Sequence, residues 1–484
     1  TELWTKVTNP KNALITYDYD NLGRLVLIEK NNTYMNNQGA EITETITTIV
    51  GYNGWGEIIS ITDPNGNITE YEYDALGRME KIIYPEEDGI QPEKIMNFNY
   101  AANVLRIIDE RGYITEEFYD MKDRLIRRIQ HTLDGEITTS TYYDSIGNPV
   151  FVYDPDNNLT VNEYNENSQL IRSTLPEETF YENGEYITTA PVVRSEYNRA
   201  GQKMKDIIQV DGSDYEITYT YDGPGRAIKT SQTYTDRTGT QQTAEQKVYY
   251  DANGNQIRVT NANNHSYEYT YSARDQVLTE ADPEGNTTSY EYDAVDNKIA
   301  MTGPRGNAEN SDGTPKYNGD FTINYAYDAL NRLIHSRLPQ GTGETGKRDV
   351  WFDYDPRGNL EYRIEPDNAK TTYSYTKRNQ VKTETVTGTT FTGAPLSYTT
   401  TYEYDEAGNN TAVTTPAGDT THMYYNSLNQ LVSTHYPEGC KDYCTYDKKG
   451  NQQTVTDGND NVTEMVYDVY NPLPQTIAAL ANTT

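Results

Sequence analysis

The stretch Tyr73-Asp74-Ala75-Leu76-Gly77-Arg78 decides the fold of this chain, because variants of it recur along almost all of the 484 residues. A second clear copy is Tyr19-Asp20-Asn21-Leu22-Gly23-Arg24, and we count nineteen copies between Tyr19 and Asn471. The first residue of each copy, the key tyrosine, most often recurs after 21 residues, as from Tyr271 to Tyr292. A period near 20 that tolerates insertions is typical of stacked supersecondary units. The chain is therefore a repeat array.

Each copy contains the residue types of a tight turn. The residue after the key tyrosine is Asp or Asn in 16 of the 19 copies, and the residue four positions after it is Gly, Asn or Asp in 17. The two exceptions at the later position are Ser168 and the copy at Tyr100, where Asn103 comes one place early. Asp and Asn side chains bond the turn backbone, whereas Gly, Asn and Asp tolerate positive φ. The pattern predicts a type I turn followed by a left-handed residue, which joins antiparallel strands.

The flanks of each turn alternate with period two. Thr69, Tyr71 and Tyr73 fall on one face and the acidic residues between them on the other, which is typical of a half-buried strand. An apolar run follows the turn, and a second turn such as Asp63-Pro64-Asn65-Gly66-Asn67 ends it. Each repeat is therefore predicted to form two antiparallel strands, close to forty along the chain. This turn chemistry disfavours an enzyme built on a parallel β-helix.

The composition predicts a thin sheet. Leu, Ile, Val and Phe make up about 17% of the chain and the net charge is −33, whereas 45 tyrosines supply most of the large apolar area. A dense central core would need more aliphatic residues. We therefore expect an all-β fold, in which antiparallel β-hairpin repeats form a long spiralling sheet that curls into a hollow barrel or cocoon-like shell. The surplus acid disfavours nucleic acid and anionic membranes as partners.

The domain organisation is predicted to be simple. Residues 1–484 are expected to form a single repeat array, with about 19 hairpins over 17–474. The chain opens at Thr1 without Met and closes abruptly at Thr484, so we expect a segment of a longer protein. No apolar run is long enough to span a membrane, no signal peptide is recognisable, and two cysteines cannot form a disulfide framework.

The candidate site residues are structural, because nothing else stands out from the repeat. They are the key tyrosines and turn residues of the clearest copies: Tyr19, Asp20, Gly23, Arg24, Tyr73, Asp74, Gly77, Arg78, Tyr143, Asp144, Gly147, Tyr221, Asp222, Gly225, Arg226, Tyr250, Asp251, Gly254, Tyr354, Asp355, Gly358, Tyr404, Asp405, Gly408, Tyr446, Asp447 and Gly450.

The repeated Tyr-Asp-x-x-Gly-Arg/Asn phrase with alternating Asp-Pro-x-Gly-Asn-x-Thr turns resembles the YD-repeat, or Rhs, superfamily across essentially the whole chain. That superfamily includes Rhs and wall-associated polymorphic toxins, the cocoon-forming subunits of toxin complexes, and teneurins. The resemblance implies a ribbon wound into a hollow shell that encloses a C-terminal toxin or another cargo polypeptide.

One departure from the family pattern is informative. Complete bacterial members usually end in an Asp-Pro-x-Gly-Leu block that closes the barrel and, in many members, supports self-cleavage. The chain lacks this block, since the Asp-Pro pairs at Asp63, Asp154 and Asp282 belong to ordinary turns. The last residues, Tyr470-Asn471-Pro472-Leu473-Pro474, still resemble a degenerate repeat. The cleavage aspartates and the toxin are therefore not carried over to this chain.

Two metal sites are weighed against ordinary turn chemistry. The turns at Asp154 and Asp457 resemble the opening of a calcium loop, with Asn165 and Asp468 eleven residues later, but the Gly and terminal Glu of a helix-loop-helix site are missing. His435, Cys440 and Cys444 could be imagined as a zinc cluster, but they lack the paired spacing of structural zinc sites. We expect no metal and no cofactor.

Other chemistry is also better explained by the repeat. Asn-x-Thr patterns at Asn67, Asn158, Asn286 and Asn461 occupy the same turn position each time, which favours the hairpin over glycosylation. Paired carboxylates would permit a glycosidase, but chance pairs are expected among 73 acidic residues. No nucleophile elbow, phosphate loop or Ser/His/Asp constellation is present, and we predict a chain that is not an enzyme.

Two functions from different classes remain. The first is a structural shell segment that encapsulates a toxin or other cargo polypeptide in a secreted or cell-surface Rhs-type protein. The alternative is a cell-surface adhesion module whose exposed tyrosines bind carbohydrate or a partner cell. Rows of tyrosine that lie between strands favour the container, and rows that face solvent favour recognition.

Overall fold

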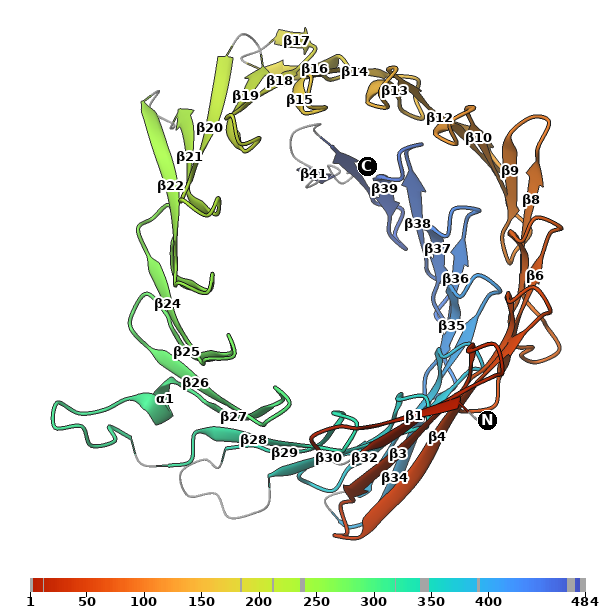
Figure 1. The fold of residues 1–484 in the computed structure, drawn as a ribbon, viewed down its shortest axis with the longest axis vertical. Coiled ribbons are helices and arrows are strands. Elements are labelled where there is room, and N and C mark those ends of the chain that lie inside the picture. Colours follow the sequence, from red (N-terminus) through yellow and green to blue (C-terminus); the bar gives the residue numbers. More distant parts are fainter. Residues whose placement is uncertain are drawn as a thin grey trace. The chain divides into compact units, whose positions relative to one another are not determined.

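The strands account for nearly all regular structure in the chain. The computed structural model describes residues 3–11, 13–182, 185–210, 213–235, 240–317, 319–339, 348–389, 392–467 and 475–478. Within these ranges one short helix, α1 (Pro304–Asn307), accompanies 41 strands. Figure 1 follows them in chain order. No helix among the described residues has the length and apolar content needed to cross a membrane. The repeat copy at Tyr467 continues into 468–474, including Asp468, which lie outside the described residues.

The chain divides into two compact units. Unit 1 contains Thr1–Thr138, Tyr325–Leu338 and Gly346–Thr484, and unit 2 contains Thr139–Asn324 and Pro339–Thr345. A single array over residues 1–484 stays a prediction. The strands of unit 1 are β1 (Leu3–Thr8), β2 (Leu14–Tyr19), β3 (Leu25–Met35), β4 (Glu41–Tyr52), β5 (Ile58–Thr62), β6 (Ile68–Tyr73), β7 (Met79–Ile83), β8 (Glu93–Asn99), β9 (Val104–Ile108), β10 (Ile114–Tyr119), β11 (Leu125–Thr132), β29 (Leu333–Arg337), β30 (Asp349–Tyr354), β31 (Leu360–Ile364), β32 (Lys370–Tyr375), β33 (Val381–Thr389), β34 (Pro395–Tyr404), β35 (Asn410–Thr414), β36 (Thr420–Tyr425), β37 (Leu431–His435), β38 (Lys441–Tyr446), β39 (Gln452–Thr456), β40 (Val462–Val466) and β41 (Gln475–Ala478).

Unit 2 is built in the same way. Its strands are β13 (Pro149–Tyr153), β14 (Leu159–Tyr164), β15 (Leu170–Thr174), β16 (Glu178–Glu182), β17 (Glu185–Thr189), β18 (Val192–Tyr197), β19 (Lys203–Val210), β20 (Ser213–Tyr221), β21 (Ala227–Thr235), β22 (Gln241–Tyr250), β23 (Gln256–Thr260), β24 (Ser266–Tyr271), β25 (Val277–Ala281), β26 (Thr287–Tyr292) and β27 (Lys298–Thr302). Two strands, β12 (Gly135–Tyr143) and β28 (Thr322–Tyr327), have residues in both units.

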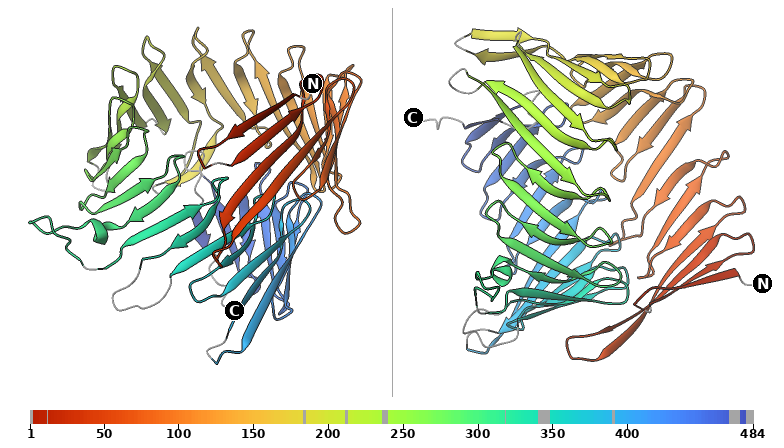
Figure 2. Two further views of the ribbon diagram at one scale, coloured as in Figure 1. Left: turned by 60° about the horizontal axis from the view of Figure 1, so that its bottom comes forward. Right: turned by 60° about the vertical axis from the view of Figure 1, so that its left-hand side comes forward.

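Consecutive strands pair antiparallel, so the sheet follows the sequence. Tyr71 of β6 pairs with Ile82 of β7, and the register shifts between Glu72 and Tyr73, where the turn begins. Among the described residues 39 strands belong to one sheet, and β16 and β17 form a separate hairpin. Figure 2 shows these hairpins side by side. The predicted all-β antiparallel hairpin repeat is therefore confirmed, and its closure into a hollow shell stays a prediction.

The sheet has a very thin core. Burial along β6 alternates residue by residue, with Tyr71 and Tyr73 half-buried and Glu70 and Glu72 exposed. The buried hydrophobic side chains among the described residues are few and mostly small: Ala13, Ile46, Ala300, Ala329, Ile334, Val350 and Ala412. With so little buried aliphatic area, the sheet depends on aromatic packing and on side-chain hydrogen bonds between repeats.

Candidate functional site: the turn rows and the seam of unit 1

The turn after each key tyrosine, here called the first turn, is held by its own aspartate. The backbone amide of Asp74 donates to the carbonyl of Arg78, and that of Gly77 donates back to the carbonyl of Asp74. Oδ1 of Asp74 accepts the amides of Leu76 and Arg78 at 2.9 and 3.0 Å, and Oδ2 accepts the Arg78 guanidinium. One carboxylate therefore satisfies two turn amides and one cation.

The left-handed conformation recurs at the position that the pattern predicts. Gly23, Gly77, Gly147, Gly225, Gly254, Gly358, Gly408 and Gly450 have φ between +77° and +107°. Asn and Asp replace glycine there at Asp123, Asp275, Asp296, Asn331, Asn379 and Asn429, all with positive φ. The exceptional Ser168 is also left-handed, at φ 59°, and Asn103, one place early, has φ 53°. Whether function depends on these residues stays a prediction.

The turns between repeats, here called second turns, have the same geometry. Oδ1 of Asp154 accepts the amides of Asp156 and Asn158 at 2.9 and 2.8 Å, and its Oδ2 accepts the Asn158 side-chain amide. Asp457 bonds Asn459 and Asn461 in the same way. The carboxylates that we weighed as calcium ligands, and the asparagines weighed as glycan acceptors, thus take part in turn hydrogen bonds.

The key tyrosines fasten each repeat to the one before it. The Tyr73 hydroxyl donates to the carbonyl of Ile58 at 2.9 Å, and Ile58 lies six residues after the preceding key tyrosine. The same bond to the residue in that position is made by Tyr52, Tyr164, Tyr197, Tyr221, Tyr250, Tyr271, Tyr354, Tyr375, Tyr404 and Tyr446. Tyr19, also named from sequence, is the first key tyrosine and has no preceding copy to bond, and Tyr143 ends β12, where it pairs with Pro149 of β13. The bond explains why the position holds tyrosine and not phenylalanine.

A second row of bonds joins neighbouring first turns. Nη1 of Arg24 donates to the carbonyl of Asn53 in the next turn at 3.1 Å, while Nε donates to Asp20 of its own turn. Arg226 and Arg332 reach the next turn in the same way, and Gln169, Gln202, Gln380 and Gln430 use their amides. The Arg24 guanidinium also lies 4.7 Å over the Tyr52 ring. The turns therefore form a continuous first-turn row.

These contacts shift the pKa of the turn carboxyls. The pKa of Asp120 is lowered to about 2, chiefly by the hydrogen bond from the Arg124 side chain. The pKa of Asp74 is also held below its ordinary range, first by the Arg78 backbone amide and then by its guanidinium. Hydrogen bonds to a carboxylate favour its charged form. The turns are thus built on ionised aspartate.

Unit 1 contains a seam, in which two stretches of the ribbon meet edge to edge. Second turns and hairpin ends within residues 9–111 contact first turns and adjoining strands within residues 328–429. The side-chain contacts are Asn9 with Ala329, Asn32 with Asp328, Tyr34 with Asp353, Glu44 with Arg332, Asp63 with Arg357, Asn65 with Asp355, Glu87 with Lys377 and Lys382, Asp88 with Lys382, and Arg111 with Asp405, Asn426 and Asn429. Residues about 300 positions apart thus lie side by side.

A buried charge cluster anchors one end of the seam. Oδ2 of Asp328 accepts Nε of Arg332 at 2.6 Å and Nδ2 of Asn32 at 3.0 Å. Arg332 also pairs with Glu44, and Asn32 donates to the same glutamate at 2.9 Å. The side chain of Asp328 has no exposed area and that of Arg332 is 15% exposed. Removing one member of such a group leaves a desolvated charge without its partner.

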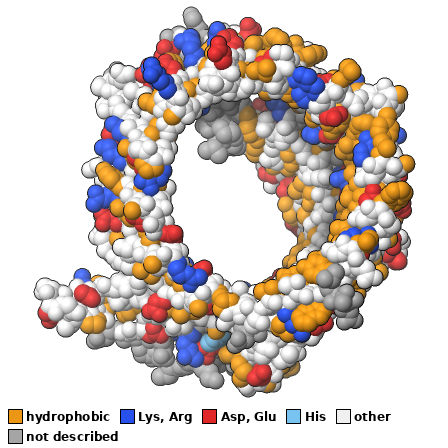
Figure 3. All heavy atoms as spheres, viewed as in Figure 1, with side chains coloured by type: hydrophobic (Ala, Val, Ile, Leu, Met, Phe, Trp, Pro, Cys, Tyr) orange, Lys and Arg blue, Asp and Glu red, His pale blue; other side chains and the backbone are white. Residues whose placement is uncertain are grey.

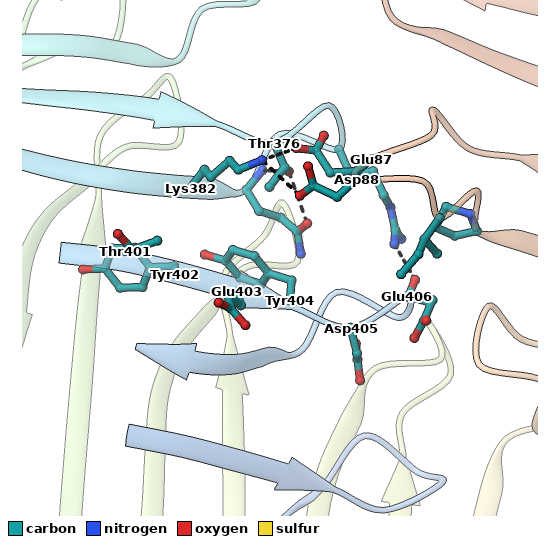
Figure 4. Close-up of a pocket in the computed structure, with 14 residues that line it drawn as sticks. Glu87, Asp88, Thr376, Lys382, Thr401, Tyr402, Glu403, Tyr404, Asp405 and Glu406 are labelled. Carbon is teal, nitrogen blue, oxygen red and sulfur yellow. Dashed lines mark hydrogen bonds and ion pairs between the residues drawn. The ribbon is translucent and has the colours of Figure 1, made fainter. Parts of the chain in front are cut away.

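An inserted hairpin forms a latch at the middle of the seam. Asp88 and Gly89 both have positive φ, which makes a tight two-residue turn between Glu87 and Ile90. Glu87 accepts the Lys377 amide at 2.7 Å and the Lys382 ammonium at 2.8 Å, and Asp88 lies 3.2 Å from the same ammonium. Figure 4 shows Lys382 reaching this tip from the opposite stretch. A pocket of about 320 Å³ beside the latch is lined partly by residues 401–406.

The residues weighed as a zinc cluster have other neighbours. The His435 ring lies 4.6 Å from that of Tyr424 and 6.4 Å from that of Tyr443. Sγ of Cys444 accepts a 3.0 Å hydrogen bond from Gln452, and Cys440 is an exposed free thiol. In the described part of the chain no three His, Cys, Asp or Glu side chains gather closely enough to hold a metal ion.

The chain was compared with solved structures and with curated proteins. It covers 31% of the chain in the crystal structure of TcdB2-TccC3-TEV, at 15% identity over 99% of its own length with a TM-score of 0.40. In the crystal structure of TcdB2-TccC3 it covers 32% of the matched chain. The identity is 14% over 99% of its own length, and the TM-score is 0.38. The chain covers 31% of the matched chain in a Photorhabdus luminescens Tc holotoxin pore. There the identity is 13% over 96% of its own length, and the TM-score is 0.33. The chain thus spans about a third of those chains. No curated protein gave a significant match.

The family model described as RHS Repeat matches residues 52–87, 250–287, 271–308 and 404–439. Each matched stretch begins at a key tyrosine and runs through the following hairpin. The repeated first turn, its key tyrosine and the second turn are thus the unit that the family model describes, and the chain contains RHS repeats at these four places.

Proposed function

We propose that this chain is a non-catalytic segment of a secreted or cell-surface shell, in which the RHS-repeat ribbon encloses a cargo polypeptide of the same protein, such as a C-terminal toxin. The seam of unit 1 is the observation that carries the proposal. A ribbon that only extended along its length would not bring Asp63 to Arg357 or Arg111 to Asp405. A ribbon that returns to its own edge can bound a space.

The orientation of the tyrosines also supports a container. Key tyrosines such as Tyr73 lie half-buried, with their hydroxyls engaged by the neighbouring repeat. These tyrosines stabilise the sheet, and their half-buried rings leave little aromatic surface open to a ligand.

The test is protection of an enclosed chain. An unstructured reporter peptide fused after the last residue should resist an added protease, and small-angle scattering should show a compact particle with a low-density centre. A matched variant, Arg332→Glu with Lys382→Glu, breaks two parts of the seam and should expose the reporter. Rapid digestion in the parent chain, or scattering from a long solid rod, would reject the container.

A recognition role is the second candidate, and one surface favours it. Tyr424 and Tyr443 are 48% and 45% exposed, on the face opposite the key tyrosines, and they flank His435. Aromatic faces of this kind can stack on sugar rings. Binding to a glycan array that is lost in Tyr424→Ala but retained in Tyr398→Ala, at an equally exposed tyrosine elsewhere, would support this alternative.

A further inference from the structure

The first-turn row near the N-terminal end of unit 1 presents uncovered apolar side chains. Leu22, Trp55 and Leu76 are 75%, 91% and 69% exposed, and each occupies the same position, three residues after its key tyrosine. Their turns are neighbours, because Arg24 bonds the turn at Asn53 and a Cβ on Gly77 would lie 2.6 Å from Oε1 of Glu57. Three large apolar side chains thus stand on consecutive turns. Contiguous exposed apolar area of this kind marks an interaction site more often than single exposed residues do.

The equivalent row later in unit 1 is covered. In the first turns that form the seam, Ala329 is 8% exposed and Asp328 1%, and Leu330, Ala407 and Leu428 are at least partly buried. The covering surface is the second-turn edge of residues 9–111. The same structural element is therefore docked in one stretch and free in the other.

The docked contacts show what a partner edge looks like. Asp63 of a second turn accepts Arg357 of a first turn at 2.5 Å, and Glu87 of the latch accepts Lys382 of β33. Arg111 with Asp405 is the reverse pair. Figure 3 shows hydrophobic side chains gathered over the part of unit 1 that Figure 1 labels β6, β8 and β9.

Unit 1 also carries a second-turn row of the required kind. The second turns at 415–419, 436–440 and 457–461 have exposed tips. They include the acidic residues Asp419, Glu438, Asp457 and Asp460. The free first-turn row provides Arg24 and Arg78 beside its apolar side chains, each paired with the aspartate of its own turn, as Arg332 is paired with Asp328 where it meets Glu44 in the seam. One unit thus presents both halves of a contact that it already makes once within itself.

We propose that the apolar first-turn row of Leu22, Trp55 and Leu76 docks onto the acidic second-turn row at 415–461 of a second copy of this chain, head to tail, as a repetition of the seam. The two surfaces differ, so the contact is heterologous and can extend beyond a dimer. The net charge of −33 opposes association at low ionic strength, and added salt screens that repulsion while leaving apolar burial intact.

The experiment is sedimentation velocity of the full chain over roughly two orders of magnitude in concentration, at low and physiological salt. The weight-average sedimentation coefficient should rise with concentration, and more steeply at the higher salt. The variant Leu22→Ser with Trp55→Ser and Leu76→Ser should give a constant monomer value. These side chains are exposed, so its thermal unfolding should match the parent chain.

Two further variants make the outcome specific. Leu133→Ser with Tyr234→Ser removes apolar side chains that are 83% and 44% exposed but lie outside the first-turn row, and this control should still associate. Asp419→Lys with Glu438→Lys reverses the charge of the proposed receiving row at two exposed positions and should abolish association. A parent chain that stays monomeric throughout, or association that survives the triple variant or the charge reversal, overturns the proposal. A monomer that still protects the fused reporter would overturn this proposal and leave the proposed function in place.

Discussion

The hydroxyl of Tyr73 donates a 2.9 Å hydrogen bond to the backbone carbonyl of Ile58 in the preceding repeat. Among the described contacts ten other key tyrosines make the equivalent bond, so these repeats are fastened to their neighbours through a group that phenylalanine lacks. In a sheet with so little buried aliphatic area, each such bond is a notable part of the attachment between neighbouring repeats.

Tyr73→Phe should therefore destabilise unit 1 by about 1 kcal/mol, the usual net value of one intramolecular hydrogen bond. The measurement is urea unfolding followed by circular dichroism. Tyr71→Phe is the matched control on the same face of the same strand, because the described contacts give its hydroxyl no hydrogen bond, and it should be close to neutral. Equal losses in the two variants would show that the hydroxyl bond is unimportant.

The glycine of the first turn is the second position at which a substitution tests the fold. Gly77 has φ +79°, and a Cβ there would also come within 2.6 Å of Oε1 of Glu57. Gly77→Val should destabilise its hairpin by roughly 1 to 3 kcal/mol, because a β-branched residue is forced to positive φ.

Two further substitutions provide comparisons for the loss of stability expected in Gly77→Val. Gly77→Asn should cost less, because asparagine tolerates the left-handed region. Gly54→Ala should be nearly neutral, since nothing lies within 4 Å of the added Cβ and its φ is not in the left-handed range. A melting temperature for Gly77→Val equal to that of the parent chain would contradict the turn assignment.

Local geometry could be predicted from sequence because it depends on local chemistry. The Asp74 to Gly77 phrase encodes its turn through side-chain bonding and positive φ, and the structure has both features there. The tyrosine-to-carbonyl bond was missed, although 45 tyrosines against seven phenylalanines hinted that the hydroxyl mattered. The arginine that follows Gly23 is part of the phrase, but the phrase does not predict its bond to the next turn.

The seam could not be predicted, because its register depends on how far the ribbon turns per repeat. Asp63 meets Arg357 and Glu87 meets Lys382 across almost 300 residues, and nothing in a local pattern specifies those pairings. The Asp88-Gly89 dipeptide is a recognisable hairpin turn. Within the repeat pattern the insertion at Asp88 lengthens one connection, and that pattern alone does not predict the latch.

The latch should respond to charge reversal. Lys382 is 39% exposed, so its pair with Glu87 is partly screened and Lys382→Glu should cost no more than about 1 kcal/mol of stability. A local measurement is more sensitive. In Lys382→Glu the repulsion between the two glutamates should release the tip of the latch, and cleavage after Glu87 by a glutamate-specific protease should accelerate under native conditions.

The reversed pair, Glu87→Lys with Lys382→Glu, is the control for this variant. It removes the cleavage site, so release of the tip must be followed by hydrogen exchange at Gly89. Exchange that is equally fast in the single and double variants would show that the pair does not hold the tip.

The buried cluster should be far more sensitive than the latch. Arg332→Met leaves the fully buried Asp328 carboxylate without its cation, and a loss of about 3 to 5 kcal/mol is expected from chemical denaturation. Arg337→Met is the control, because that side chain is 59% exposed and its partner Asp349 also bonds His335. Restoration of stability in Arg332→Met with Asp328→Asn would confirm that the unpaired charge causes the loss. A small effect of Arg332→Met alone would mean that the cluster does not anchor the seam.

Acid should loosen the first turns through Asp120. Its pKa is lowered to about 2 in the folded chain, mainly by the Arg124 hydrogen bond, and returns to an ordinary value near 3.9 on unfolding. A carboxyl with a depressed folded pKa contributes stability that is fully present above the unfolded pKa and is lost as pH falls through the folded pKa. The free energy of unfolding should therefore fall between about pH 5 and pH 2. Asp120→Asn should flatten that slope, since asparagine keeps an oxygen acceptor for the turn amides without titrating. An unchanged slope in Asp120→Asn would assign the acid sensitivity to other carboxyls.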